Sequence, residues 1–128
     1  MSDANSTRWQ DIIDMPRERL NLAEAALVIA GDDYPQLDVA AYLNRIDELA
    51  VTFRRRLRAD IAPAEKLALL NHYFFGELDF KGNTEDYYDP RNSFLNEVIE
   101  RKLGIPITLS LLFIEIGRRV GLPLSGVS

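Results

Sequence analysis

The residues able to perform nucleophilic or acid–base chemistry are few in this chain. It has no cysteine and a single histidine, His72. A thiol nucleophile is therefore excluded, and a histidine-based metal site would lack its usual ligands. Ser110 could act as a nucleophile only with a base beside it, and His72 is better interpreted as a structural or surface histidine. We therefore predict no catalytic residue, no metal site and no cofactor.

The acidic stretch 76–89 is the second place where chemistry could reside. Its side chains with oxygen ligands are Asp79, Asn83, Glu85, Asp86 and Asp89. Calcium loops place such ligands at alternate positions and add a glycine and a late glutamate. Here Lys81 occupies a ligand position and Gly82 comes one place too early. Because Gly and Asn tolerate positive φ, we interpret the stretch as a turn-rich connection without metal.

The composition limits the classes of protein to consider. With 128 residues, 47% of them hydrophobic, the chain suits one domain with a real core. Its net charge of −5 argues against a general nucleic-acid binder. The arginines within 54–58 are typical of a solvated helix end, although contact with an acidic partner or a phosphate stays open. The first ten residues lack the apolar core of a signal peptide, so we expect a cytoplasmic protein with no membrane or nucleic-acid partner.

The stretch 103–123 is the most apolar in the chain and predicts a central helix. Thr108, Glu115 and Arg119 lie seven and four residues apart, which places them on one helical stripe. The other sides are apolar, as in a helix at the middle of a domain. Pro106 suits the first helical turn. The apolar residues of the stretch are Leu109, Leu111, Leu112, Phe113, Ile114 and Ile116.

The rest of the chain is also predicted to be mainly helical. Apolar residues recur at helical spacing within 17–30, 38–57 and 63–74. Asp38 is expected to cap the second of these helices, and Pro63 to open the third. A fourth helix is predicted to start with Asp89 as N-cap and Pro90 as first residue, to bury Phe94, Leu95, Val98, Ile99 and Leu103, and to close at Gly104. Residues 1–16 are expected to be a flexible segment and 17–128 to form the domain.

Three segments carry a resemblance to a known family. They are FKGN at 80–83, YDPRNS at 88–93 and GIPITLS at 104–110. Together they resemble the transglutaminase-like superfamily, in its SirB-type bacterial branch, and a related module occurs in an F-box protein. The stretch 25–30, followed by Tyr34 and Pro35, is similar to the helical lead-in of that family.

The resemblance implies the helical half of a papain/transglutaminase-like α+β domain. The central helix would pack on an antiparallel sheet, and that sheet would lie after residue 128, so the domain is expected to be truncated. In catalytic members of the superfamily a cysteine opens the central helix, and a histidine and an aspartate follow on strands. Here Pro106 stands near the nucleophile position.

The resemblance therefore implies a non-catalytic domain that acts in protein or peptide binding or in regulation. The alternative is a hydrolase or acyl transferase of the same fold whose remaining catalytic residues lie beyond residue 128. The residues expected to contact a partner precede or open the central helix: Asn83, Tyr88, Asn92, Ser93 and Thr108. The same residues could instead serve as turn, cap and packing residues.

A missing sheet would leave apolar residues of the central helix uncovered. Apolar patches larger than a few hundred Å² seldom remain open in soluble monomers. The strand-like tail 123–128 would add unpaired backbone groups. We therefore expect a homo-oligomer through the central helix, unless the other helices cover it within one chain.

Overall fold

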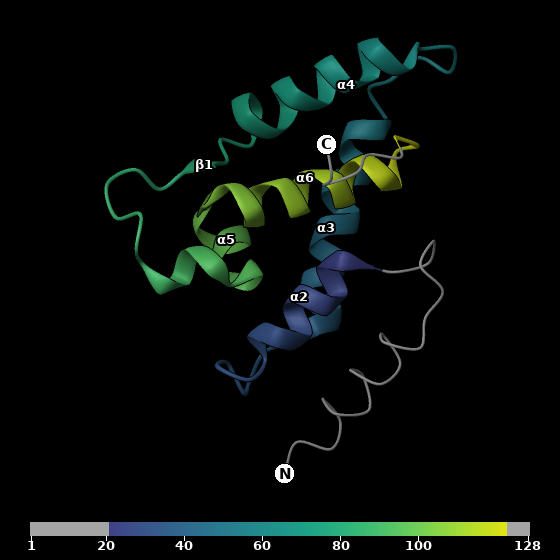
Figure 1. Ribbon diagram of the computed structural model, residues 1–128. Coiled ribbons are helices and arrows are strands. Elements are labelled where there is room, and N and C mark those ends of the chain that lie inside the picture. The colour runs from purple at the N-terminus through teal and green to yellow at the C-terminus, as the bar shows by residue number, and fades with distance from the viewer. Residues whose placement is uncertain (1–20, 123–128) are drawn as a thin grey trace.

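The computed structural model of the protein describes residues 21–122 (Figure 1). Its elements, in chain order, are α2 (Leu22–Ala30), α3 (Val39–Arg54), α4 (Pro63–Asn71), the π-helical turn η2 (His72–Glu77), β1 (Lys81–Gly82), the 3₁₀ turn η3 (Pro90–Ser93), α5 (Leu95–Arg101), β2 (Leu103–Gly104) and α6 (Pro106–Arg119). The two short strands pair in parallel. The prediction of a mainly helical fold is confirmed.

Helices α2, α3, α4 and α6 begin where a polar side chain or a proline occupies the first backbone positions. Asn21 and Asp38 each accept a backbone N–H from the first turn, of α2 and α3 respectively. Pro63 and Pro106 occupy the first turns of α4 and α6. Proline suits that position because its missing N–H would have no partner within the helix. The starts predicted at Asp38, Pro63 and Pro106 are confirmed.

Helix α6 runs through the middle of the described structure, between α4 and α2 in the view of Figure 1. It packs against α2, α3, α5 and both strands. Leu109, Leu112 and Ile116 belong to the buried core, and Phe113 lies half-buried against it. The central role predicted for this helix is confirmed.

The polar stripe of α6 is buried rather than exposed to solvent. Glu115 is only 1% exposed, and its carboxylate accepts the Leu22 N–H at 3.0 Å. The same carboxylate pairs with Arg118 at 2.6 Å and with Arg119 at 2.7 Å. A buried charge without partners would cost several kcal/mol, so these contacts are needed for the carboxylate to remain inside. They join the start of α2 to the end of α6.

The predicted fourth helix is wrong at its start. Asp89 does act as an N-cap, but of the short turn η3, and α5 begins only after Phe94. Phe94 has extended backbone angles. The carbonyl oxygen of Asn92, which a continuous helix would use internally, accepts the Thr108 hydroxyl instead. A tertiary contact thus separates the two helical pieces.

The predicted closure of this helix at Gly104 is also wrong. Lys102 ends α5 in the left-handed conformation, with φ 61°. Gly104 lies in β2, where a Cβ atom would stand 2.8 Å from the Thr108 hydroxyl oxygen and 3.2 Å from a methyl carbon of Val98. The glycine is therefore required by the close approach of β2 to α6, and not by helix termination.

Most of the six apolar residues expected to lie uncovered on α6 are buried. Leu109, Leu112, Ile114 and Ile116 are buried, and only Leu111 and Phe113 remain half-exposed. Helices of the same chain thus cover four of the six residues from which an uncovered patch was expected to be drawn, as the alternative within one chain allows. The segment 1–16 and the tail 123–128 lie outside the described residues, so neither prediction about them is tested.

Candidate functional site

The three segments that carry the family resemblance meet in space at the opening of α6. β1 lies beside β2, with Lys81 opposite Leu103 and Gly82 opposite Gly104. The pairing continues past β1, because the Asn83 N–H donates to the Gly104 carbonyl at 2.9 Å. The motifs are therefore one structural unit, although as many as 20 residues separate them in sequence.

Asn83 and Asn92 form the buried centre of this unit. The Asn83 side-chain amide donates to Oδ1 of Asn92 at 3.1 Å, and both residues are buried. The Asn92 amide nitrogen donates to the carbonyls of Asp86 at 3.0 Å and Tyr87 at 2.9 Å. Oδ1 of Asn83 accepts the Asp86 N–H at 3.0 Å. The two asparagines thus hold the loop 83–92 from inside.

Thr108 connects the loop to α6. Its hydroxyl accepts the Ile105 N–H at 3.2 Å and donates to the Asn92 carbonyl oxygen at 2.8 Å. The hydroxyl satisfies one of the N–H groups that a helix start leaves unpaired. Asn83, Asn92 and Thr108, which we expected to contact a partner, therefore serve as cap and packing residues in the structure.

The other two expected contact residues, Tyr88 and Ser93, lie on the surface. Tyr88 is 90% exposed. Its ring stands edge-on to that of Tyr87, with centroids 5.3 Å apart and planes at 89°. Tyr87 is also exposed. Since the carbonyl of Tyr87 is bonded to the buried Asn92, the two rings are presented by an anchored loop.

Asp89 fixes the far end of the loop. Its carboxylate accepts the Arg91 backbone N–H at 2.9 Å and three side-chain hydrogen bonds from the same arginine, the shortest at 2.7 Å. Arg101 approaches at 3.5 Å. The hydrogen bonds from Arg91 lower the pKa of Asp89 from 3.8 to about 2. The carboxylate expected to cap a helix is thus also the partner of two arginines, which sequence periodicity did not indicate.

The first position of α6, near which the superfamily's nucleophile is expected, holds a proline. Pro106 is exposed at its first position, and Ile107 beside it is 74% exposed. Ser110 and His72 are exposed as well, and they share no hydrogen bond within the described part of the chain. Across residues 21–122 no three His, Asp or Glu side chains are grouped as metal ligands would be. In the same range, no helix is both long and apolar enough to cross a membrane.

Comparison with known proteins assigns the chain to a family. Residues 40–128 match the family model described as the transglutaminase-like superfamily, and the chain belongs to that superfamily. It is 43% identical over 124 residues to a UPF0162 protein of Xylella fastidiosa, with 94% of this chain and 43% of the relative aligned. The resemblance inferred from the three motifs is confirmed, and these relatives agree with the bacterial branch.

Two further relatives also align with only part of their own length. A UPF0162 protein of Vibrio cholerae is 32% identical over 124 residues, covering 92% of this chain and 44% of the relative. Human F-box only protein 21 is 40% identical over 65 residues, which is 51% of this chain and 10% of that protein. The chain thus spans less than half the length of these relatives. No solved structure matches it.

Proposed function

We propose that the chain is a non-catalytic transglutaminase-like domain that acts in the cytoplasm by binding a protein or peptide, or in regulation through such binding. The observation that carries the proposal is the opening of α6, where Pro106 holds the first position and the chain offers no thiol. A helix N-terminus stabilises a thiolate through its dipole, and a proline ring provides no group to use it.

The anchored loop 83–92 is the proposed contact surface. Tyr87 and Tyr88 expose aromatic rings, and tyrosine is enriched where protein interfaces concentrate their binding energy. The buried Asn83 and Asn92 hold the loop before any partner arrives. A preformed surface loses little conformational entropy on binding, which favours affinity.

The first test measures catalysis. Purified protein is incubated with a fluorescent amine and a glutamine-containing protein substrate, and separately with a peptide amide whose hydrolysis is followed. We expect rates equal to those of a heat-killed control. Incorporation or hydrolysis above that control would contradict the non-catalytic assignment.

The second test measures binding at the loop. A photo-cross-linking amino acid replaces Tyr88 in cells that express the protein, and the matched control carries it at Ala59, which is exposed on the connection after α3. We expect an adduct of defined mass at position 88 that is absent at position 59. Adducts that are identical at both positions, or missing at both, would remove the loop from the proposal.

An enzyme of the same fold is the alternative. The observation that favours it is the coverage of the UPF0162 relatives, of which this chain aligns to 43% and 44%. A hydrolase or acyl transferase would then draw its remaining catalytic residues from beyond residue 128. The amine-incorporation and hydrolysis assays, repeated on a longer chain, distinguish the two proposals. Activity that resists thiol-blocking reagents would support the alternative.

We also propose that the domain forms a homo-oligomer that includes part of α6. Phe113 of α6 is half-exposed and stacks on the exposed Phe75, with centroids 5.9 Å apart. Leu67 and Leu69 on α4 are exposed as well. These apolar side chains support an interface at the η2 side of α6.

A further inference from the structure

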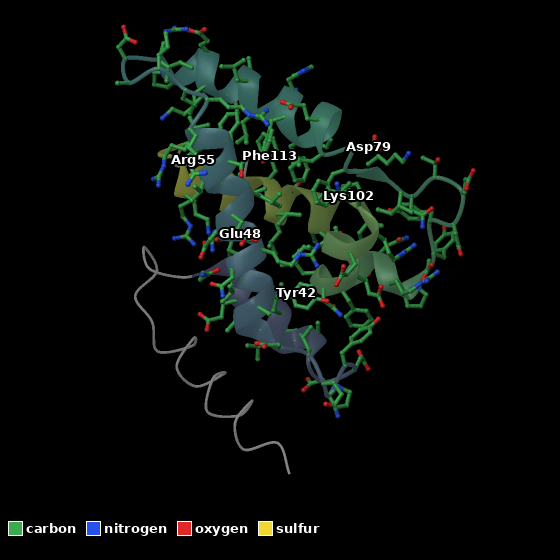
Figure 2. All side chains as sticks on the ribbon, turned by 180° about the vertical axis from the view of Figure 1, so that it is seen from behind. Tyr42, Glu48, Arg55, Asp79, Lys102 and Phe113 are labelled. Atoms are coloured by element: carbon green, nitrogen blue, oxygen red, sulfur yellow. The ribbon has the colours of Figure 1, made fainter. Side chains whose placement is uncertain are left out.

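A groove separate from the loop 83–92 lies between the start of α3, the connection before it and α5. It has a volume of about 470 Å³. Its lining residues come from 33–38, Tyr42 and Asn96. Figure 2 labels Tyr42, which points from α3 toward the side chains of α5.

Two tyrosines form rigid walls of this groove. The hydroxyl of Tyr34 donates to Glu97 at 2.9 Å, and that of Tyr42 donates to Glu100 at 2.8 Å. The ring of Tyr34 also stands edge-on to Phe94, with centroids 5.4 Å apart. Because both hydroxyls are bonded to α5, the rings have fixed orientations. Arg45 of the same chain already lies over the Tyr42 ring, 5.7 Å from its centroid, so Tyr34 is the ring offered to a ligand.

Asn96 contributes an unsatisfied acceptor at the same place. The residue is only 5% exposed, and its Oδ1 is buried without a hydrogen-bond partner. Buried polar atoms are normally paired, so an unpaired one calls for an explanation. A ligand N–H donor that reached this oxygen would remove the penalty.

The charges around the groove are mainly negative. Asp33 and Asp38 belong to its lining, and Asp38 accepts the first-turn N–H of α3. Glu97 and Glu100 accept the hydroxyl groups of the two tyrosines. Two cations are close, but each has a carboxylate partner: Arg45 pairs with Glu100 and Arg91 with Asp89. The groove therefore favours a cationic ligand.

We propose that this groove binds an arginine side chain of a partner protein. A guanidinium is planar and stacks on aromatic faces, which fits the ring of Tyr34, and Arg45 makes the same kind of contact with the ring of Tyr42. Its five N–H groups can donate to several acceptors, and Asn96 and Asp33 both line the groove. Lysine has a compact, strongly hydrated charge and lacks the stacking plane, so arginine is preferred.

The inference goes beyond the proposed function and does not depend on it. Tyr88 and its loop are not among the residues that line the groove. Loss of one site by mutation therefore leaves the other available for measurement.

The test is an NMR titration of the isotopically labelled full chain with the blocked peptide acetyl-Ala-Ala-Arg-Ala-Ala-amide. We expect saturable shifts at the Asn96 side-chain amide and at the backbone amides of residues 33–38. The peptide with citrulline, the neutral isostere of arginine, should bind about tenfold more weakly, as loss of a charge-assisted hydrogen bond predicts.

Matched variants locate the effect. Asn96→Leu removes the acceptor at similar volume, and Asp33→Asn neutralises an exposed carboxylate of the groove lining. Each should weaken peptide binding severalfold, while Asp60→Asn, an exposed carboxylate outside the groove lining, should not. The spectra report whether each variant stays folded.

Three outcomes would overturn the proposal. The first is equal affinity for the arginine and citrulline peptides. The second is an equal loss in the Asp33→Asn and Asp60→Asn variants, which would indicate diffuse attraction to acidic surface. The third is the absence of saturable shifts at the solubility limit of the peptide.

Discussion

Replacement of Asn92 by alanine tests whether the buried amide network holds the candidate site together. Asn92 is fully buried and its side chain takes part in three hydrogen bonds, to Asn83, Asp86 and Tyr87. The change removes all three. It leaves the backbone carbonyl of Asn92, and hence its bond to Thr108, in place. The perturbation is therefore specific to the loop 83–92.

The expected loss of stability follows from these contacts. A net contribution of about 1 kcal/mol per hydrogen bond gives a loss of about 3 kcal/mol. The Asn83 amide also loses its acceptor inside the protein, which makes this figure a lower bound. Asn92→Asp has the same shape but places an oxygen against the carbonyls of Asp86 and Tyr87. At neutral pH it should be at least as destabilising as alanine.

Urea denaturation followed by circular dichroism measures the loss, and hydrogen exchange of the loop amides locates it. Ser93→Ala is the matched control, because Ser93 is adjacent and exposed, and its effect should stay below about 0.5 kcal/mol. A loss under about 1 kcal/mol for Asn92→Ala, or loop exchange equal to that of the native protein, would refute the argument.

Three further predictions follow from the packing, the charges and the exposed apolar surface. Leu112 is fully buried and Phe113 only half-buried. In urea denaturation, Leu112→Ala should therefore lower the free energy of unfolding by about 2–5 kcal/mol and Phe113→Ala by about 2 kcal/mol. A larger loss for Phe113→Ala than for Leu112→Ala would contradict the assigned burial. The pKa of Asp89 is about 2 in the folded protein against 3.8 for a free side chain, so the stabilisation by its carboxylate is complete above pH 3.8 and disappears as the pH falls through about 2. In the Asp89→Asn variant, the melting temperature should therefore depend less on pH in this acidic range. A pH dependence equal to that of the native protein would contradict this. Light scattering over a concentration series should show an oligomer that Phe75→Asp dissociates with the helical signal retained, and a monomer at every concentration would contradict self-association.

Much of the helical architecture could be predicted from the sequence by itself. Helix starts depend on local backbone chemistry, so Asp38, Pro63 and Pro106 marked them correctly. The periodicity of the stretch 103–123 identified α6 as the central helix, because burial on several sides requires apolar residues on several sides. Composition alone excluded cysteine chemistry.

The candidate site depended on contacts between distant residues. The sequence analysis proposed five contact residues without distinguishing buried from exposed side chains: Asn83, Tyr88, Asn92, Ser93 and Thr108. Only the folded chain places three of them in a buried network and two on the surface, because hydrogen bonds such as that between Thr108 and Asn92 join residues 16 positions apart. No local propensity encodes such a pair.

The same reason accounts for the errors around α5. The sequence determined that residues 89–103 favour helix, and Asp89 as an N-cap was predicted correctly. The tertiary structure decided where the helix breaks and closes: the Thr108 hydroxyl engages the Asn92 carbonyl, and the close approach of α6 to β2 requires Gly104. Local chemistry therefore set the starts of α3, α4 and α6, and packing against α6 set where the predicted fourth helix breaks and ends.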